Sequence, residues 1–220
     1  MKPDFEAIRT SDEIRTYITQ ADASLIALGY TEHSFAHVTR CAQMAAHLLS
    51  QLGYDQRQVE LARIAGYMHD IGNVVNRVDH AQSGAVMAFR ILDKMGMAPE
   101  DVAVVITAIG NHDEGTAYPV NAVAAALILA DKTDVRRSRV RNRATISFDI
   151  HDRVNYAVEQ SDLTLDTQAR TLTLELTIDT AISSVMDYFE IFMNRMLLCR
   201  KAAKYFGLEF RMVVNGSAVL

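Results

Sequence analysis

Three segments repeat apolar residues with the period of an α-helix and then place a polar residue on the same face. The three polar residues are His37, His112 and Asp131, and each stands where the 3.6-residue period calls for a core residue. Burying an imidazole or a carboxylate is costly unless a cation, a hydrogen-bond partner or water satisfies it. The chain should therefore fold so that several helices direct polar side chains into one interior.

A fourth segment, Ile64-Ala-Gly-Tyr-Met-His-Asp-Ile-Gly-Asn73, places His69 and Asp70 side by side within apolar sequence. An adjacent His-Asp pair proves little alone, because the chain contains two more, His112-Asp113 and His151-Asp152. What matters is whether other residues converge on the first pair.

The periodicity predicts a mainly α chain with a helical body followed by a small α/β appendage. Helical patterns cover about residues 11–28, 31–52, 55–70, 80–96, 99–112 and 119–131. A short helix near 149–159, a hairpin over 162–179, a helix over 181–206 and a strand over 208–215 should form a three-stranded antiparallel sheet covered by one helix. We predict a helical domain at residues 1–145 and a small α+β subdomain at 146–220 packed on it.

Composition excludes several classes of partner. The formal charge of −5 and the pI near 5.8 argue against DNA or membrane binding by bulk charge. The two cysteines, Cys41 and Cys199, are too few for a disulfide framework and fit reduced thiols. The N-terminus does not resemble a signal peptide, and the longest apolar run, residues 122–130, is too short to span a bilayer. We expect a cytoplasmic protein with no membrane partner, and a homodimer is left open.

Six residues with metal-ligand chemistry fall on core-facing positions or at helix ends: His37, His69, Asp70, His80, His112 and Asp131. Such a set suits one or two divalent ions, with iron, manganese, zinc, cobalt and magnesium all open. The alternatives are hydrogen-bonded core histidines and, for Asp131, an ion pair with one of the arginines that follow it.

The order of these residues resembles the HD superfamily of metal-dependent phosphohydrolases. The matching segments are EHSFAHVTRCAQMA around His37, MHDIGN around His69-Asp70 and LILADKTD around Asp131. The surroundings of His80 and His112 are similar to the two-metal branches, notably diadenosine-polyphosphate hydrolases and cyclic-dinucleotide phosphodiesterases. The resemblance covers about residues 31–135 and implies an all-helical fold there.

The resemblance also implies roles for the six residues. Asp70 would bridge two ions, with His37, His69 and Asp131 completing one site and His80 and His112 the other. His69 and Asp70 would form the catalytic centre, where metal-activated water attacks phosphorus. His33, one turn before His37, would support that residue as an outer contact.

Phosphate contacts are expected from a second group of residues. Many members carry a lysine where this chain has Asn73, so a cation near the phosphate is either missing or supplied by another residue. Residues Arg139 to Arg143 fit a solvated charged stretch. The proposed substrate-binding residues are Asn73, Asn76, Arg77, Lys132, Arg136 and Arg137.

The sequence thus predicts a phosphohydrolase that cleaves a phosphate ester or anhydride of a small, nucleotide-like substrate. Two alternatives remain open at this point. Some relatives hold two iron ions on the same ligands and act as oxygenases, and others keep the fold as catalytically weak nucleotide-binding or sensing modules.

Overall fold

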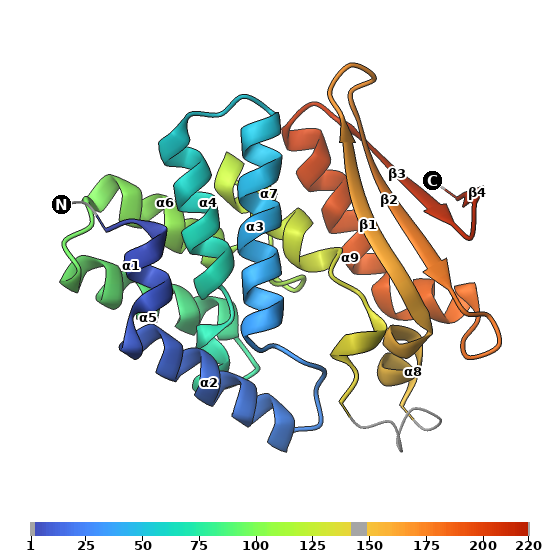
Figure 1. Cartoon of the computed structure of the whole chain (residues 1–220), viewed down its shortest axis with the longest axis horizontal. Helices are drawn as coiled ribbons and strands as arrows, with labels where there is room; N and C mark the ends of the chain where they lie inside the picture. Colours follow the sequence, from blue (N-terminus) through green and yellow to red (C-terminus); the bar gives the residue numbers. More distant parts are fainter. Residues whose placement is uncertain (1–2, 142–148, 220) are drawn as a thin grey trace. The chain divides into compact units, whose positions relative to one another are not determined.

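The computed structural model describes residues 3–141 and 149–219, and its contacts divide the chain into two compact units, Met1–Asp131 and Lys132–Leu220 (Figure 1). Each unit is described by itself. The domain boundary predicted between residues 145 and 146 lies outside the described residues. Within the described ranges, no helix combines the length and apolar character that crossing a membrane requires.

The first unit is helical, and every helix predicted in this region is present. Side-chain caps begin two of these helices. The side chain of Ser11 accepts a hydrogen bond from the Ile14 backbone, and that of Asp55 accepts one from the Gln58 backbone. The elements are α1 (Phe5–Thr10), α2 (Asp12–Ala27), α3 (Phe35–Gln51), α4 (Gln56–Met68), the 3₁₀ turn η1 (Ile71–Val74), α5 (His80–Lys94), α6 (Pro99–Gly110) and α7 (Ala122–Lys132).

Two details of this unit differ from the sequence-based expectation. The short helix α1 was not predicted, although Asp4 caps it by accepting from the Ala7 backbone. Helix α3 begins at Phe35 rather than near Thr31, because Ser34 adopts an extended backbone and caps the helix through the Ala36 backbone N–H. The four intervening residues, 31–34, therefore lead into the helix as irregular chain.

The second unit contains η2 (Arg137–Arg139), α8 (Ile150–Ala157), β1 (Val158–Asp166), β2 (Thr171–Ile178), α9 (Val185–Tyr205), β3 (Glu209–Val214) and β4 (Ser217–Ala218). The strands form one sheet in the order β1-β2-β3-β4. The hairpin of β1 and β2 is present as predicted, and the prediction of a mainly α chain is confirmed.

The predicted three-stranded antiparallel sheet is wrong in two respects. Strand β3 pairs parallel to β2, with Thr171 opposite Glu209, because α9 carries the chain back to the end of the sheet where β2 began. A fourth strand, β4, pairs antiparallel to β3 across the two-residue turn Asn215-Gly216, whose φ angles of 50° and 77° suit this dipeptide. The Asn-Gly pair was a visible turn signal in the sequence.

Candidate metal centre

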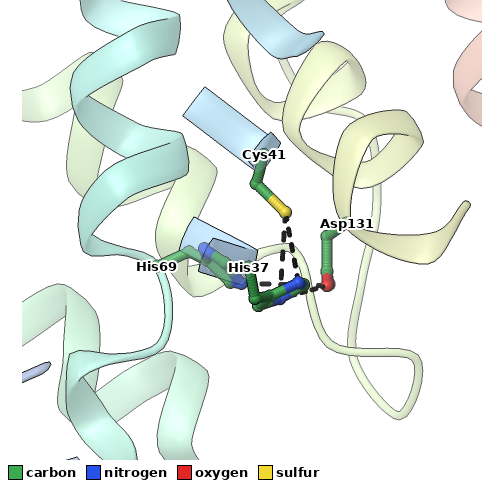
Figure 2. Close-up of side chains that lie close together, drawn as sticks. All are labelled: His37, Cys41, His69 and Asp131. Atoms are coloured by element: carbon green, nitrogen blue, oxygen red, sulfur yellow. Dashed lines mark hydrogen bonds and ion pairs between the residues drawn. The ribbon is translucent and has the colours of Figure 1, made fainter. Parts of the chain in front are cut away.

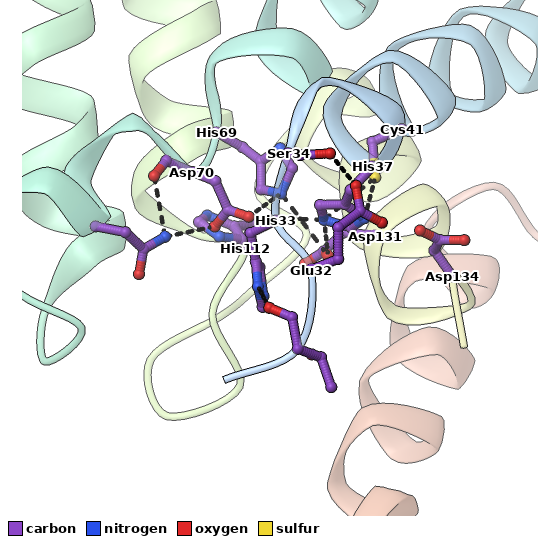
Figure 3. A network of polar contacts seen from close by, with 12 residues as sticks. Glu32, His33, Ser34, His37, Cys41, His69, Asp70, His112, Asp131 and Asp134 are labelled. Atoms are coloured by element: carbon purple, nitrogen blue, oxygen red, sulfur yellow. Dashed lines mark hydrogen bonds and ion pairs between the residues drawn. The ribbon is translucent and has the colours of Figure 1, made fainter. Parts of the chain in front are cut away.

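The six predicted ligands converge in the first unit, although they come from widely separated parts of the sequence. Figure 3 shows His37, His69, Asp70, His112 and Asp131 close together. His37, His69, Asp70, His80 and His112 are buried, and Asp131 is nearly so, with 11% of its side chain exposed. The elements that carry them are α3 (His37), the end of α4 (His69 and Asp70), the start of α5 (His80), the segment after α6 (His112) and the last turn of α7 (Asp131).

Two imidazoles and two carboxylates meet at one side of the cluster. The Nε2 of His37 lies 3.3 Å from Asp131 Oδ1 and 3.6 Å from Asp70 Oδ2. The Nε2 of His69 lies 3.3 Å from Asp70 Oδ2 and 3.7 Å from Asp131 Oδ1. Ligand atoms around one tetrahedral ion with bonds of about 2.1 Å are roughly 3.4 Å apart, so these separations suit a single divalent ion. We call His37, His69 and Asp131 the His37 half of the cluster.

The other oxygen of Asp70 faces the remaining histidines. The Nε2 of His80 lies 3.6 Å from Asp70 Oδ1 and 3.2 Å from the Nε2 of His112. These two histidines form the His80 half of the cluster. Asp70 therefore presents one carboxylate oxygen to each half, which is the arrangement that a bridging ligand requires.

Three of the imidazoles are held in one tautomer by the backbone. In each, Nδ1 lies within hydrogen-bond distance of the carbonyl three residues earlier: His69 at 2.8 Å from Gly66, His80 at 3.1 Å from Arg77 and His112 at 2.6 Å from Ile109. Because a carbonyl only accepts, Nδ1 carries the proton in all three rings and Nε2 carries the lone pair. All three lone pairs then belong to the nitrogens nearest the cluster, where they can ligate a metal.

The charges of the cluster favour a cation. Among the buried atoms, His69 Nε2 and Asp70 Oδ2 have no hydrogen-bond partner, which is costly in a buried site unless an ion supplies the missing contact. Burial by itself raises the pKa of Asp70, but the neighbouring imidazoles, led by His69, hold that pKa well below its usual value. Burial lowers the pKa of His69, and the carboxylates of Asp70 and Asp131 outweigh it and raise the pKa. The residues therefore fit a divalent ion.

Two glycines allow the backbone to bring these side chains together. A Cβ on Gly66 would lie 2.7 Å from the Ala42 backbone, so α4 packs directly against α3 at the turn before His69. A Cβ on Gly72 would lie 2.0 Å from the His80 carbonyl oxygen and 2.5 Å from the Gly84 backbone nitrogen. Only glycine permits either approach, and each places one ligand-bearing segment against another.

Two of the predicted substrate-binding residues extend the cluster. The amide nitrogen of Asn73, which is buried, donates at 2.9 Å to both Asp70 Oδ1 and the Asp70 carbonyl. Arg77 Nη1 donates at 3.3 Å to Asn73 Oδ1 and lies 3.4 Å from His80 Nε2. Asn76 instead supports the loop, since its side-chain oxygen accepts from the Val78 backbone at 2.9 Å.

The other predicted substrate-binding residues belong to the second unit, and two of them have acidic or carbonyl partners within it. Arg136 Nε lies 2.8 Å from Asp134 Oδ1. Arg137 donates to the Tyr156 carbonyl at 2.7 Å and lies 3.3 Å from Glu159 and 3.6 Å from Asp179. Lys132 is the last residue of α7 and directly follows Asp131. Their contribution to substrate binding stays a prediction.

The sequence interpretation missed Cys41 as a member of the cluster. His37, Cys41, His69 and Asp131 offer ligand atoms that all lie within 4.8 Å of one another (Figure 2). The signal was present, because Cys41 follows His37 by four residues and so shares its helix face, but that face was read as an apolar stripe. His33 also lies near the cluster, with its ring centroid 5.5 Å from that of His37.

The chain is similar in sequence to a known domain family and to proteins of two other organisms. The HD domain family matches residues 34–190, a longer span than the 31–135 that the sequence suggested. An uncharacterized protein of Methanocaldococcus jannaschii is 23% identical, over 72% of this chain and 70% of that protein. Ribonuclease Y of Opitutus terrae is 29% identical over 54% of this chain, which spans only 21% of that enzyme.

A solved structure is also similar to the chain. The crystal structure of a predicted HD superfamily hydrolase from an uncultured Thermotogales bacterium has a TM-score of 0.45 and 27% sequence identity. The similarity covers 60% of this chain and 73% of that one.

Proposed function

The chain belongs to the HD domain family, and from that premise we propose that it is a phosphohydrolase that cleaves a phosphate ester or anhydride of a nucleotide-like substrate. The observation that carries the proposal is the pair of buried atoms without hydrogen bonds, His69 Nε2 and Asp70 Oδ2. They lie among imidazoles whose lone pairs are already turned inward by backbone hydrogen bonds. Such a site offers nitrogen and oxygen atoms that can ligate a cation. None of its six converging residues carries the hydroxyl group that serves as the nucleophile in other hydrolases.

The residues divide naturally between two ions. His37, His69 and Asp131 would hold one ion together with Asp70 Oδ2, and His80 and His112 would hold a second together with Asp70 Oδ1. A divalent ion held there would supply the positive charge that activates water and offsets the charge developing on phosphate oxygens. Iron, manganese, zinc, cobalt and magnesium all accept ligands of these types.

The chain's own side chains orient the site. Asp70 stays ionised at neutral pH because the surrounding imidazoles hold its pKa low. The Asn73 amide donates to Asp70 Oδ1 and fixes the carboxylate so that its two oxygens face opposite halves of the cluster. Arg77 brings the guanidinium fork that suits a phosphate group, and we propose Asn73, Asn76, Lys132, Arg136 and Arg137 as further substrate contacts.

The comparisons support a phosphate ester as the bond that is cleaved. The name of one relative, ribonuclease Y, describes cleavage of RNA, in which nucleotides are joined through phosphate esters. Because this chain spans about a fifth of that enzyme, only the class of bond, and not the substrate, enters the proposal.

The test is a hydrolysis screen with metal-free protein reloaded separately with each of the five metals. Nucleotides, dinucleotides and phosphomonoesters are the substrates, and Asp70→Asn is compared with Asp152→Asn, which alters the same dipeptide in the second unit. We expect metal-dependent hydrolysis that is lost in Asp70→Asn and kept in Asp152→Asn. Equal inactivity of wild type and Asp70→Asn with every metal would refute the proposal.

A further inference from the structure

Arg77 lies where it competes with a metal ion for one lone pair. Its Nη1 is 3.4 Å from His80 Nε2 and donates to Asn73 Oδ1 at 3.3 Å. The proton of the His80 ring is on Nδ1, which donates to the Arg77 carbonyl at 3.1 Å, so Nε2 can only accept. One lone pair binds either an N–H group or a metal ion, and a guanidinium keeps its charge at any physiological pH.

The surroundings of His80 Nε2 call for positive charge. The Nε2 atoms of His80 and His112 are 3.2 Å apart, and the backbone bonds of both rings leave a lone pair on each. Two lone pairs at that distance repel each other unless a cation lies close to them. The Arg77 guanidinium supplies such a charge at the His80 half. The Asp70 carboxylate, whose Oδ1 lies 3.6 Å from His80 Nε2, is negative and adds to the need for it.

The two halves of the cluster differ in this respect. At the His37 half, His69 Nε2 is buried and has no hydrogen-bond partner. At the His80 half, the corresponding nitrogen of His80 lies within 3.4 Å of the Arg77 side chain. An added divalent ion therefore finds a ready ligand at His69, whereas at His80 it must displace a cation first.

Arg77 is held in a way that permits displacement. It belongs to the segment between η1 and α5, its side chain is partly exposed, and its contacts of 3.3 Å and 3.4 Å are long for hydrogen bonds of a charged donor. Its guanidinium also lies 5.6 Å from the centre of the Tyr30 ring. A phosphate group offers the same guanidinium two short charge-assisted hydrogen bonds, which are stronger than the contacts it would lose.

We propose that Arg77 is a displaceable cation: it occupies the His80 half of the cluster until a phosphate-bearing substrate draws it away, and a second divalent ion binds in exchange. The inference rests on the proposed function, since it needs a two-ion cluster and an anionic substrate. Because binding couplings are reciprocal, the substrate strengthens binding of the second ion and the second ion strengthens binding of the substrate.

The experiment measures Mn²⁺ binding to the metal-free full chain by calorimetry and by analysis of bound metal after dialysis. Wild type is compared with Arg77→Met, which removes the charge, and Arg77→Lys, which keeps it. Arg90→Met is the matched control, because Arg90 is an exposed arginine of α5 paired with Glu13. Circular dichroism checks that each variant is folded.

We expect wild type and Arg90→Met to bind one ion tightly and a second at least tenfold more weakly. In Arg77→Met, the ratio of the dissociation constants of the second and first ions should be at least tenfold smaller than in wild type. Arg77→Lys should behave like wild type. Inorganic phosphate should strengthen binding of the second ion to wild type, and it should do so at least tenfold less in Arg77→Met.

Equal affinity for the second ion in wild type and Arg77→Met would overturn the inference. If wild type nevertheless hydrolysed phosphate esters in the presence of metal, the proposed function would stand and only the role of Arg77 would be refuted. If wild type bound no divalent ion at all, both would fall together.

Discussion

The two units of the chain use their interiors for different purposes. In the helical unit, the interior ends in a cluster of imidazoles and carboxylates, two of whose buried atoms have no hydrogen bond. In the second unit, apolar side chains such as Leu174 and Met212 alternate with exposed ones along the strands. Burying unsatisfied polar atoms lowers stability, whereas burying apolar side chains raises it. The polar cluster of the first unit therefore suits ion binding at a cost in stability, whereas the apolar face of the sheet in the second unit contributes stability.

The strongest test of that contrast is Asp70→Asn. Loss of the charge that both halves share should abolish binding of divalent ions and reduce hydrolysis by at least about 10³-fold, since metal ions supply several kcal/mol of transition-state stabilisation. Wild type should also melt at a higher temperature when a divalent ion is added, and the variant should not. Thermal melting with and without Mn²⁺ measures this, and an unchanged metal-dependent shift in the variant would contradict it.

A large apolar truncation in the sheet should lower the stability of the protein and leave its metal binding unchanged. Leu174 is fully buried in the middle of β2, so Leu174→Ala should lower the free energy of unfolding by about 2–5 kcal/mol. Its partner across the hairpin, Leu163, is only partly buried, and Leu163→Ala should cost less. Denaturant unfolding measures both, while the number of ions bound to the folded protein should stay as in wild type.

Gly66→Ala should lower both the stability of the protein and its affinity for metal. The new methyl group would meet the Ala42 backbone at 2.7 Å and push α4 away from α3, at a cost of about 1–3 kcal/mol. Since His37 lies on α3 and His69 directly follows α4, metal affinity should fall as well. The matched control is Gly110→Ala, whose Cβ would meet only the Ala85 methyl at 3.7 Å. Metal titrations in which both variants bind like wild type would show that this close approach does not set the site.

The smallest effect is expected at a helix cap of the second unit. Ser184 begins α9 by accepting a hydrogen bond from the Asp187 backbone, and Asp187 completes a capping box. Ser184→Ala should cost about 1 kcal/mol of unfolding free energy. Hydrolysis and metal binding at a temperature where the variant is folded should match those of wild type, and a selective loss of activity would break the division of roles between the units.

Much of the helical unit was predictable because local rules and the global fold agree there. Caps such as Ser11 and Asp55 are marked by short-range sequence signals, and the apolar period fixes which face is buried. His37, His112 and Asp131 could be singled out because each interrupts an otherwise apolar face. Their convergence on His69 and Asp70 was suggested by the order of the motifs.

The remaining features depend on contacts that no local pattern specifies. Strand β3 looks the same in sequence whether it pairs parallel or antiparallel, and only the length and path of α9 decide the pairing. Cys41 looks like an ordinary core residue, because a small apolar side chain and a thiol fit the same stripe. The position of Arg77 beside His80 depends on how the loop after η1 closes, which spacing alone does not determine.

The backbone bonds of His69, His80 and His112 have a consequence for the metal-free protein. Each ring is oriented by a carbonyl of its own helix or turn, so the empty centre keeps its shape as part of the folded chain. Stripping the ions should thus leave a rigid template rather than a collapsed pocket. Reloading of the His37 half should then follow the speed at which ions lose their water, without a slow refolding phase.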